Sequence, residues 1–281
     1  DKYKNWLEKN PINHGFWGHW PFYFPEMPLD IQSVKSARDS ADVAVVVIGR
    51  SSGEDRDCKL EKGSWFLADD EEAMLRNVTA EFDRVILLLN IGGIMDMSIL
   101  EKYKEKFGAV MIVWQGGMES GNAAADLLCG NVNPSGRLTD TIAKHYEDYP
   151  SSANFGGDKF NEYKEDIYVG YRYFETFAKE NVLYPFGYGI GYTDFELEML
   201  KAEKADGGFE FNVKVKNIGN SDGREVVQLY LGKPCGKLGN PEMCLVSFGK
   251  TETLKSGETE TVKLSTDMYQ LSSYDEQASA Y

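Results

Sequence analysis

The densest group of ionisable side chains in the sequence directly follows one of its most apolar runs. Val43 to Ile48 are branched or small apolar residues, and the segment GRSSGEDRD continues with two arginines, two serines and three acids. So short an apolar run is typical of a strand buried on both faces, as in a parallel sheet covered by helices. Ligand chemistry in such sheets gathers just beyond the carboxyl ends of the strands. Glu54, in the middle of the segment, is therefore the first candidate for chemistry.

A carboxyl group such as that of Glu54 can act as a general acid or base when its pKa lies near the working pH. The like charges of Asp55 and Asp57 would raise the pKa of Glu54, whereas Arg50 and Arg56 would lower it. The sequence leaves the sum of these effects open. The alternative interpretation is a solvated loop acid without a catalytic role, since most loop acids are of that kind.

The pattern around this segment predicts an α/β fold with a mostly parallel sheet. Apolar runs and amphipathic stretches alternate as strand and helix, which indicates βαβ units with right-handed crossovers and helices on both faces of the sheet, an αβα sandwich. We expect strands at residues 43–48, 84–90 and 109–114, and helices at residues 30–42, 69–82, 95–107 and 122–129.

A glycine-rich turn, GGMESG at residues 116–121, opens the last of these helices. Such turns can hold phosphate at a helix N-terminus. This one lacks both the GxGxxG spacing and a Walker lysine, and it carries Glu119 where a phosphate would be repelled. The sequence therefore argues against nucleotide binding, and we interpret Glu119 as a brace of the turn.

The second half of the chain has a different character. Residues 137–192 are rich in tyrosine, phenylalanine and glycine without a long periodic segment, and from Phe195 short alternating strands and turns follow. Regularly spaced short strands are typical of a β-sandwich. We expect an aromatic arm at residues 1–30, an α/β domain at 31–150, a wrapping linker at 151–194 and a small β-sandwich at 195–281.

Composition narrows the function classes. The 281 residues carry a net charge of −15, which argues against a nucleic-acid partner and against a polybasic membrane patch. No apolar run approaches the ~20 residues of a membrane span. The four cysteines and three histidines have no metal-type spacing. Cys235 and Cys244 are close enough in sequence to pair, but free thiols are favoured, and with no visible signal peptide we expect a cytoplasmic protein.

Five segments occur in an order that resembles a known family. They are IGRSSGEDRD, WQGGMESGNAAADLLCGNVNPSGRLTDT, DIYVGYRYFETF, VLYPFGYGIGYTDF and LVSFGKTETLKSGETETVKL. Together they are similar to the C-terminal half of family 3 glycoside hydrolases, the β-glucosidase group. The resemblance covers nearly the whole chain and implies an α/β sandwich domain followed by a fibronectin type III-like domain.

The resemblance also implies roles for individual residues. Glu54 matches the general acid/base of a retaining β-glycosidase, which needs two carboxyl groups about 5–5.5 Å apart. The candidates for binding the carbohydrate substrate, or for orienting Glu54, are Arg50, Ser52, Asp55 and Arg56. Trp17 and Trp20 of the arm are more simply explained by packing, although a sugar ring can stack on them. This hydrolysis requires neither a metal nor another cofactor.

One part of the family pattern is absent from this sequence. The nucleophile of the family is an aspartate on a (β/α)8 barrel, and eight βα units alone need about 250 residues. We therefore expect a fragment that is inactive alone, with the barrel domain of the same protein as its partner and a homo-oligomer as an open alternative. A non-catalytic carbohydrate-binding or structural module is the competing hypothesis.

Overall fold

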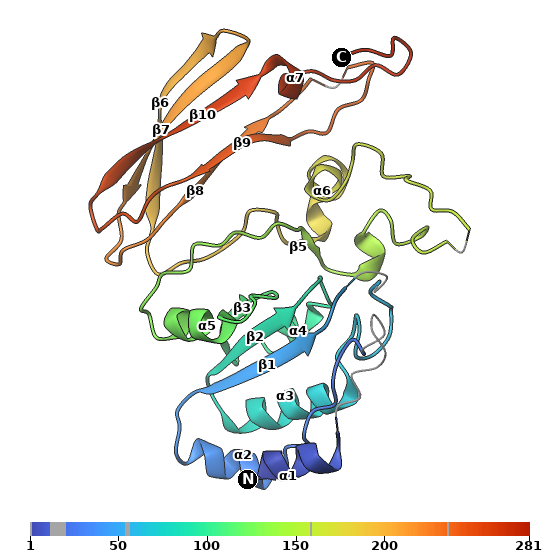
Figure 1. The fold of residues 1–281 in the computed structure, drawn as a ribbon, viewed down its shortest axis with the longest axis vertical. Helices are drawn as coiled ribbons and strands as arrows, with labels where there is room; N and C mark the ends of the chain where they lie inside the picture. The colour runs from blue at the N-terminus through green and yellow to red at the C-terminus, as the bar shows by residue number, and fades with distance from the viewer. Residues whose placement is uncertain (1, 12–20, 54–56, 158, 235) are drawn as a thin grey trace. The chain divides into compact units, whose positions relative to one another are not determined.

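The structure is a computed structural model that describes residues 2–11, 21–53, 57–157, 159–234 and 236–281. Contacts within the chain define two compact units, residues 1–124 and residues 125–281. Figure 1 traces the helices and strands of each unit. The finer division into an arm, an α/β domain, a linker and a sandwich stays a prediction.

The first unit is built on a parallel sheet of three strands in the order β1-β2-β3. The strands are β1 (Ala44–Arg50), β2 (Val85–Ile91) and β3 (Phe107–Ile112). Each strand pairs with the next in parallel, with Ile48 opposite Leu89 and Leu89 opposite Ile112. This confirms the predicted α/β class, and it brings the carboxyl ends of all three strands to one edge.

Helices accompany this sheet, and the most regular of them is α3 (Asp69–Glu81). Acids fill its first turn, where the positive end of the helix dipole favours them, and Leu75 and Val78 are buried. The predicted helix at 95–107 is much shorter in the structure. It begins at Ser98, whose backbone amide donates to the Asp96 carboxylate, and it ends at Lys102, before β3 begins at Phe107. The other helices of this part are α1 (Lys2–Lys9), α2 (Ile31–Arg38), α4 (Ser98–Lys102) and α5 (Ser120–Leu128).

The prediction that the first strand is buried on both faces is wrong. Val46 and Ile48 are 5% and 0% exposed, but Val45 and Val47 on the opposite face of β1 are 50% and 49% exposed. β1 is the outermost strand of the described three-stranded sheet, and α3 packs against it. An unbroken run of valines has no period, so the sequence alone could not reveal that its two faces differ.

After the end of α5, the second unit continues with largely irregular chain that contains several short elements. Strands β4 (Ile142–Ala143) and β5 (Val182–Tyr184) pair antiparallel, and Phe174 of α6 (Tyr171–Phe177) is 1% exposed in a small core with Ala143 and Ala178. The 3-10 turns η1 (Tyr146–Asp148) and η2 (Lys179–Asn181) lie on either side of α6 in the sequence.

A β-sandwich follows, as predicted. Its sheets have the orders β10-β7-β6 and β8-β9, and all their pairs are antiparallel. In β7, Val213 and Val215 alternate with more exposed residues and join Val227 and Leu264 in the core. The elements are β6 (Phe195–Ala205), β7 (Gly208–Asn217), β8 (Val226–Leu231), β9 (Cys244–Lys250), β10 (Thr259–Asp267) and α7 (Met268–Leu271).

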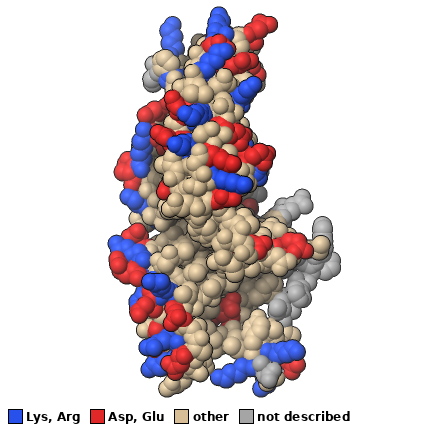
Figure 2. Space-filling view, turned by 90° about the vertical axis from the view of Figure 1, so that its left-hand side faces the viewer, with Lys and Arg blue, Asp and Glu red and all other residues tan. Residues whose placement is uncertain are grey.

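The surface carries charges of both signs. Figure 2 shows lysine and arginine side chains interspersed with aspartate and glutamate over the face that it presents. In the part of the chain that the structure describes, no helix combines the length and the apolar character needed to cross a membrane.

Candidate active site

The candidate site lies at the edge of the sheet where the parallel strands end. Ser52 follows β1, and its hydroxyl donates a 3.2 Å hydrogen bond to the side-chain oxygen of Gln115, which follows β3. Gly92, just after β2, lies beside this pair. A Cβ atom on Gly92 would lie 1.9 Å from the Ser52 hydroxyl and 2.8 Å from the Gln115 amide nitrogen. Glycine therefore allows the chain ends of the three strands to meet.

Trp114 at the same edge has an unusual backbone. Its φ of 50° lies in the left-handed region, which a bulky residue rarely adopts. The side-chain amide nitrogen of Asn90 donates a 2.6 Å hydrogen bond to the Trp114 carbonyl and helps to hold this conformation. Strained backbone of this kind is concentrated at functional sites, and this observation supports the choice of the edge as a candidate site.

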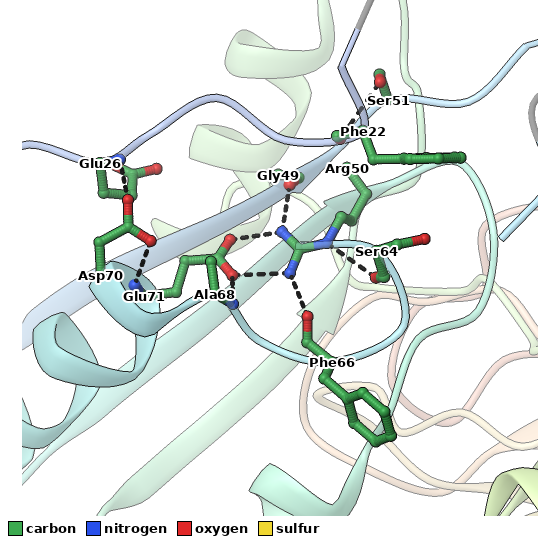
Figure 3. Close-up of polar contacts among 10 residues, drawn as sticks. All are labelled: Phe22, Glu26, Gly49, Arg50, Ser51, Ser64, Phe66, Ala68, Asp70 and Glu71. Carbon is green, nitrogen blue, oxygen red and sulfur yellow. Dashed lines mark hydrogen bonds and ion pairs between the residues drawn. The ribbon is translucent and has the colours of Figure 1, made fainter. Parts of the chain in front are cut away.

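An ion pair lies directly behind the edge. Arg50, the last residue of β1, pairs with Glu71 in the first turn of α3 through Nη1–Oε1 and Nη2–Oε2 distances of 2.5 and 2.7 Å. The two side chains are only 5% and 2% exposed. The carboxylate of Glu71 also accepts a hydrogen bond from the Ala68 amide, so it caps its own helix (Figure 3).

The guanidinium group of Arg50 is fully used inside the protein. Besides Glu71, it donates to the carbonyl oxygens of Gly49, Ser64 and Phe66 at 2.7, 3.1 and 3.2 Å (Figure 3). These bonds and the two to Glu71 account for all five N–H groups of an arginine. The role of Arg50 in binding a sugar or in orienting Glu54 stays a prediction.

Hydrogen bonds also fix both described ends of the loop that carries the candidate acid. On one side, the amide of Ser51 donates to the Phe22 carbonyl at 2.7 Å and its hydroxyl donates to the Pro21 carbonyl at 2.5 Å. On the other side, the Ser64 hydroxyl accepts a 2.9 Å bond from the Lys59 amide. The loop therefore begins and ends at anchored backbone.

The surroundings of the ion pair are rich in acids. Burial, with the nearby charges of Glu71 and Asp70, raises the pKa of the Glu26 carboxyl. Burial likewise raises the pKa of the Tyr23 hydroxyl, with Asp70 and Glu71 adding to the shift. The Tyr23 ring centroid lies 5.7 Å from the Arg50 guanidinium carbon, a distance suited to a cation–π contact. The positive charge of Arg50 opposes the rise in the pKa of both groups.

The structure describes only some of the predicted site residues. Glu54, Asp55, Arg56, Trp17 and Trp20 lie outside the described residues, so their roles stay predictions. Ser52 lies at the sheet edge, and Arg50 lies behind it.

Sequence reasoning missed Glu71 and Gln115. The sequence pattern presents Glu71 only as one of several acids favoured by the helix dipole. An arginine at the end of a buried strand needs a buried acid, and this requirement was the available signal. The Glu119 carboxylate accepts a 2.5 Å hydrogen bond from the side-chain amide nitrogen of Asn122 in α5, a contact that braces the turn.

The fold defines an α/β domain with a parallel sheet, followed by a β-sandwich. Profiles of known families give the same two parts: the glycosyl hydrolase family 3 C-terminal domain matches residues 25–192, and the fibronectin type III-like domain matches residues 225–281. This chain belongs to glycosyl hydrolase family 3, of which it contains the C-terminal domain.

Individual relatives agree with this assignment. A β-glucosidase from Ruminococcus albus is 44% identical over 275 residues, covering 98% of this chain and 29% of the relative. The structure of a β-glucosidase from Paenibacillus barengoltzii superposes with a TM-score of 0.93 at 44% identity, over 98% of this chain and 31% of that one. The structure of β-glucosidase 3B from Thermotoga neapolitana in complex with glucose gives a TM-score of 0.85 at 36% identity, over 98% and 39%. This chain therefore spans about a third of the length of these relatives.

Proposed function

We propose that this chain supplies the general acid/base of a retaining β-glucosidase, with Glu54 in that role. The nucleophile is an aspartate on a (β/α)8 barrel domain of the same protein. The bonds that the enzyme hydrolyses are terminal β-D-glycosidic bonds. The observation that carries the proposal is one of sequence order: in this family 3 chain SGEDRD closely follows β1, a strand that ends at the carboxyl edge of a parallel sheet.

The proposed chemistry requires Glu54 to change its protonation state twice. As a carboxylic acid it protonates the departing glycosidic oxygen, and as a carboxylate it then activates the water that hydrolyses the glycosyl-enzyme. Ser52, Asp55 and Arg56 are the proposed contacts to the sugar or to Glu54. Trp17 and Trp20 are proposed to offer flat apolar faces to a sugar ring, besides packing the arm.

A complementation experiment tests this proposal. The chain is mixed with a separately produced barrel domain, and hydrolysis of 4-nitrophenyl β-glucoside is measured. We expect each component to be inactive alone and the mixture to be active, with a mixture containing the Glu54→Gln chain far slower on glucosides with poor leaving groups. Sugar binding by the chain alone, with no hydrolysis by the mixture, would instead support a non-catalytic carbohydrate-binding module.

A further inference from the structure

We propose that Arg50 and Glu71 are positioning residues for the acid/base loop, acting through the two ends of that loop. This inference rests on the proposed role of Glu54. It assigns a purpose to an ion pair that lies behind the sheet edge and not at the surface that a substrate reaches.

The first reason is that the pair joins both ends of the loop. Arg50 immediately precedes the loop, and its Nε donates to the carbonyl of Ser64. The hydroxyl of that same Ser64 accepts the amide of Lys59, at the far end of the loop. A continuous chain of contacts therefore runs from the strand end that enters the loop to the backbone that leaves it.

The second reason is that the pair ties these ends to a rigid element. Glu71 belongs to α3, and its carboxylate holds the fork of Arg50 at two points while also accepting the Ala68 amide. A two-point arginine–carboxylate contact fixes orientation as well as distance, which a lysine cannot do. The base of the loop is thereby set against the N-terminus of a helix.

The third reason is that stability alone is a poor explanation for a buried pair. Desolvation of two charges offsets much of their attraction, and apolar residues of similar size often serve as well or better. What the charged pair offers over apolar residues is a fixed orientation of the loop base. A displacement of about 1 Å at a catalytic group can reduce a rate about 100-fold, so a fixed loop base has a direct catalytic value.

The test uses the active protein, in which this chain is combined with its barrel domain, and compares kcat/KM for two aryl β-glucosides. Dinitrophenol leaves without a proton, whereas a simple phenol needs the acid. The ratio of kcat/KM for the dinitrophenyl glucoside to kcat/KM for the phenyl glucoside therefore reports how well Glu54 delivers its proton, and it rises when proton delivery fails. We expect Glu71→Gln and Arg50→Lys each to raise this ratio about tenfold or more, in the same direction as Glu54→Gln.

Two further variants separate positioning from simple loss of stability. Glu225→Gln weakens a different half-buried arginine–carboxylate pair, in which Arg137 Nη2 lies 2.7 Å from each Glu225 oxygen, and it should leave the ratio unchanged. The double variant Arg50→Met/Glu71→Leu replaces the charges by apolar contacts. It should recover thermal stability relative to Glu71→Gln while keeping the raised ratio.

The outcomes are distinct. If Glu54→Gln raises the ratio but Glu71→Gln, Arg50→Lys and the double variant keep the wild-type value, the positioning role is overturned and the proposed function stands. If Glu54→Gln itself leaves the ratio unchanged, the proposed function fails, and the positioning role falls with it. A raised ratio in Glu225→Gln equal to that in Glu71→Gln would also overturn the inference, because any lost ion pair would then suffice.

Discussion

Arg50 and Glu71 face each other across the end of β1 and the start of α3, with two N···O distances of 2.5 and 2.7 Å and almost no exposure to solvent. Arg50 immediately precedes the loop that carries the candidate acid, and Glu71 lies at the N-terminus of the helix that follows the loop. The pair therefore bears both on the stability of the first unit and on the proposed positioning of the loop.

The first prediction concerns the stability of this pair. Glu71→Ala leaves a buried guanidinium without its carboxylate, and we expect the free energy of unfolding to fall by about 3–5 kcal/mol. Glu72→Ala is the matched control. Glu72 is the next residue of the same helix turn. Its Oε1 lies 3.1 Å from Lys102 Nζ in an exposed ion pair, so loss of this pair should change stability by less than about 1 kcal/mol. Urea unfolding followed by circular dichroism compares the two, and equal losses would contradict the buried-pair account.

A second prediction follows from the close approach at Gly92. Gly92→Ala places a methyl group on the Ser52 hydroxyl and against Gln115, so it must displace the contact between them. We expect kcat/KM of the active protein to fall about tenfold or more, in line with the rate penalty for a displaced site. Gly93→Ala is the neighbouring control, because a methyl group there would meet nothing within 4 Å and the φ of Gly93 is not positive. Similar rates for the two variants would show that the sheet edge tolerates displacement.

A third prediction concerns pH and Glu26. Burial and nearby acids raise the pKa of this carboxyl in the folded state, so its favourable contribution is fully present below the unfolded pKa and is lost as pH rises through the folded pKa. At pH 7 the ionised carboxyl of Glu26 is therefore unfavourable in the folded state, and Glu26→Gln removes this unfavourable charge. The variant should melt at a higher temperature than the parent protein at pH 7, and the difference should vanish near pH 4.

The control for this pH effect is Glu105→Gln, at an exposed turn of the same unit. Its melting temperature should follow that of the parent protein at every pH. A Glu26→Gln difference that persisted unchanged from pH 7 to pH 4 would exclude titration of Glu26 as the cause.

A fourth prediction concerns the β-sandwich. Asn217 is fully buried, and its amide donates to the carbonyls of Ser221 and Leu254 at 2.8 Å each while its oxygen accepts from Thr193 and Gly219. At about 1 kcal/mol for each bond, Asn217→Ala should lower the free energy of unfolding of the sandwich by about 2–4 kcal/mol.

Asn217→Asp should be more harmful at pH 7 than at pH 4. A carboxylate there would face two carbonyl oxygens, so the folded state would raise its pKa, and stability would be lost as pH rises. Asn212→Asp, at a half-buried position of the same strand, provides the comparison. Equal pH dependence in both variants would contradict the role of the buried amide.

The sequence predicted the alternating elements well, because hydrophobic period carries that information. The alternation of Val213 and Val215 identified β7, and the acid-rich first turn identified the start of α3. The exposure of Val45 and Val47 was missed, since an unbroken apolar run looks the same whether one face or both are covered. The Arg50–Glu71 pair was also missed, because the two residues are far apart in sequence and only the packing of α3 on β1 brings them together.

The most direct measurement for the central claim is chemical rescue of Glu54→Ala in the active protein. Removing the acid/base leaves space for a small anion, and azide needs no general base to attack the glycosyl-enzyme. With 2,4-dinitrophenyl β-glucoside as substrate, the account predicts that azide raises the turnover rate and yields β-glucosyl azide, with the configuration of the substrate retained. Unchanged activity of Glu54→Ala toward glucosides with poor leaving groups, together with no azide product, would contradict the assignment.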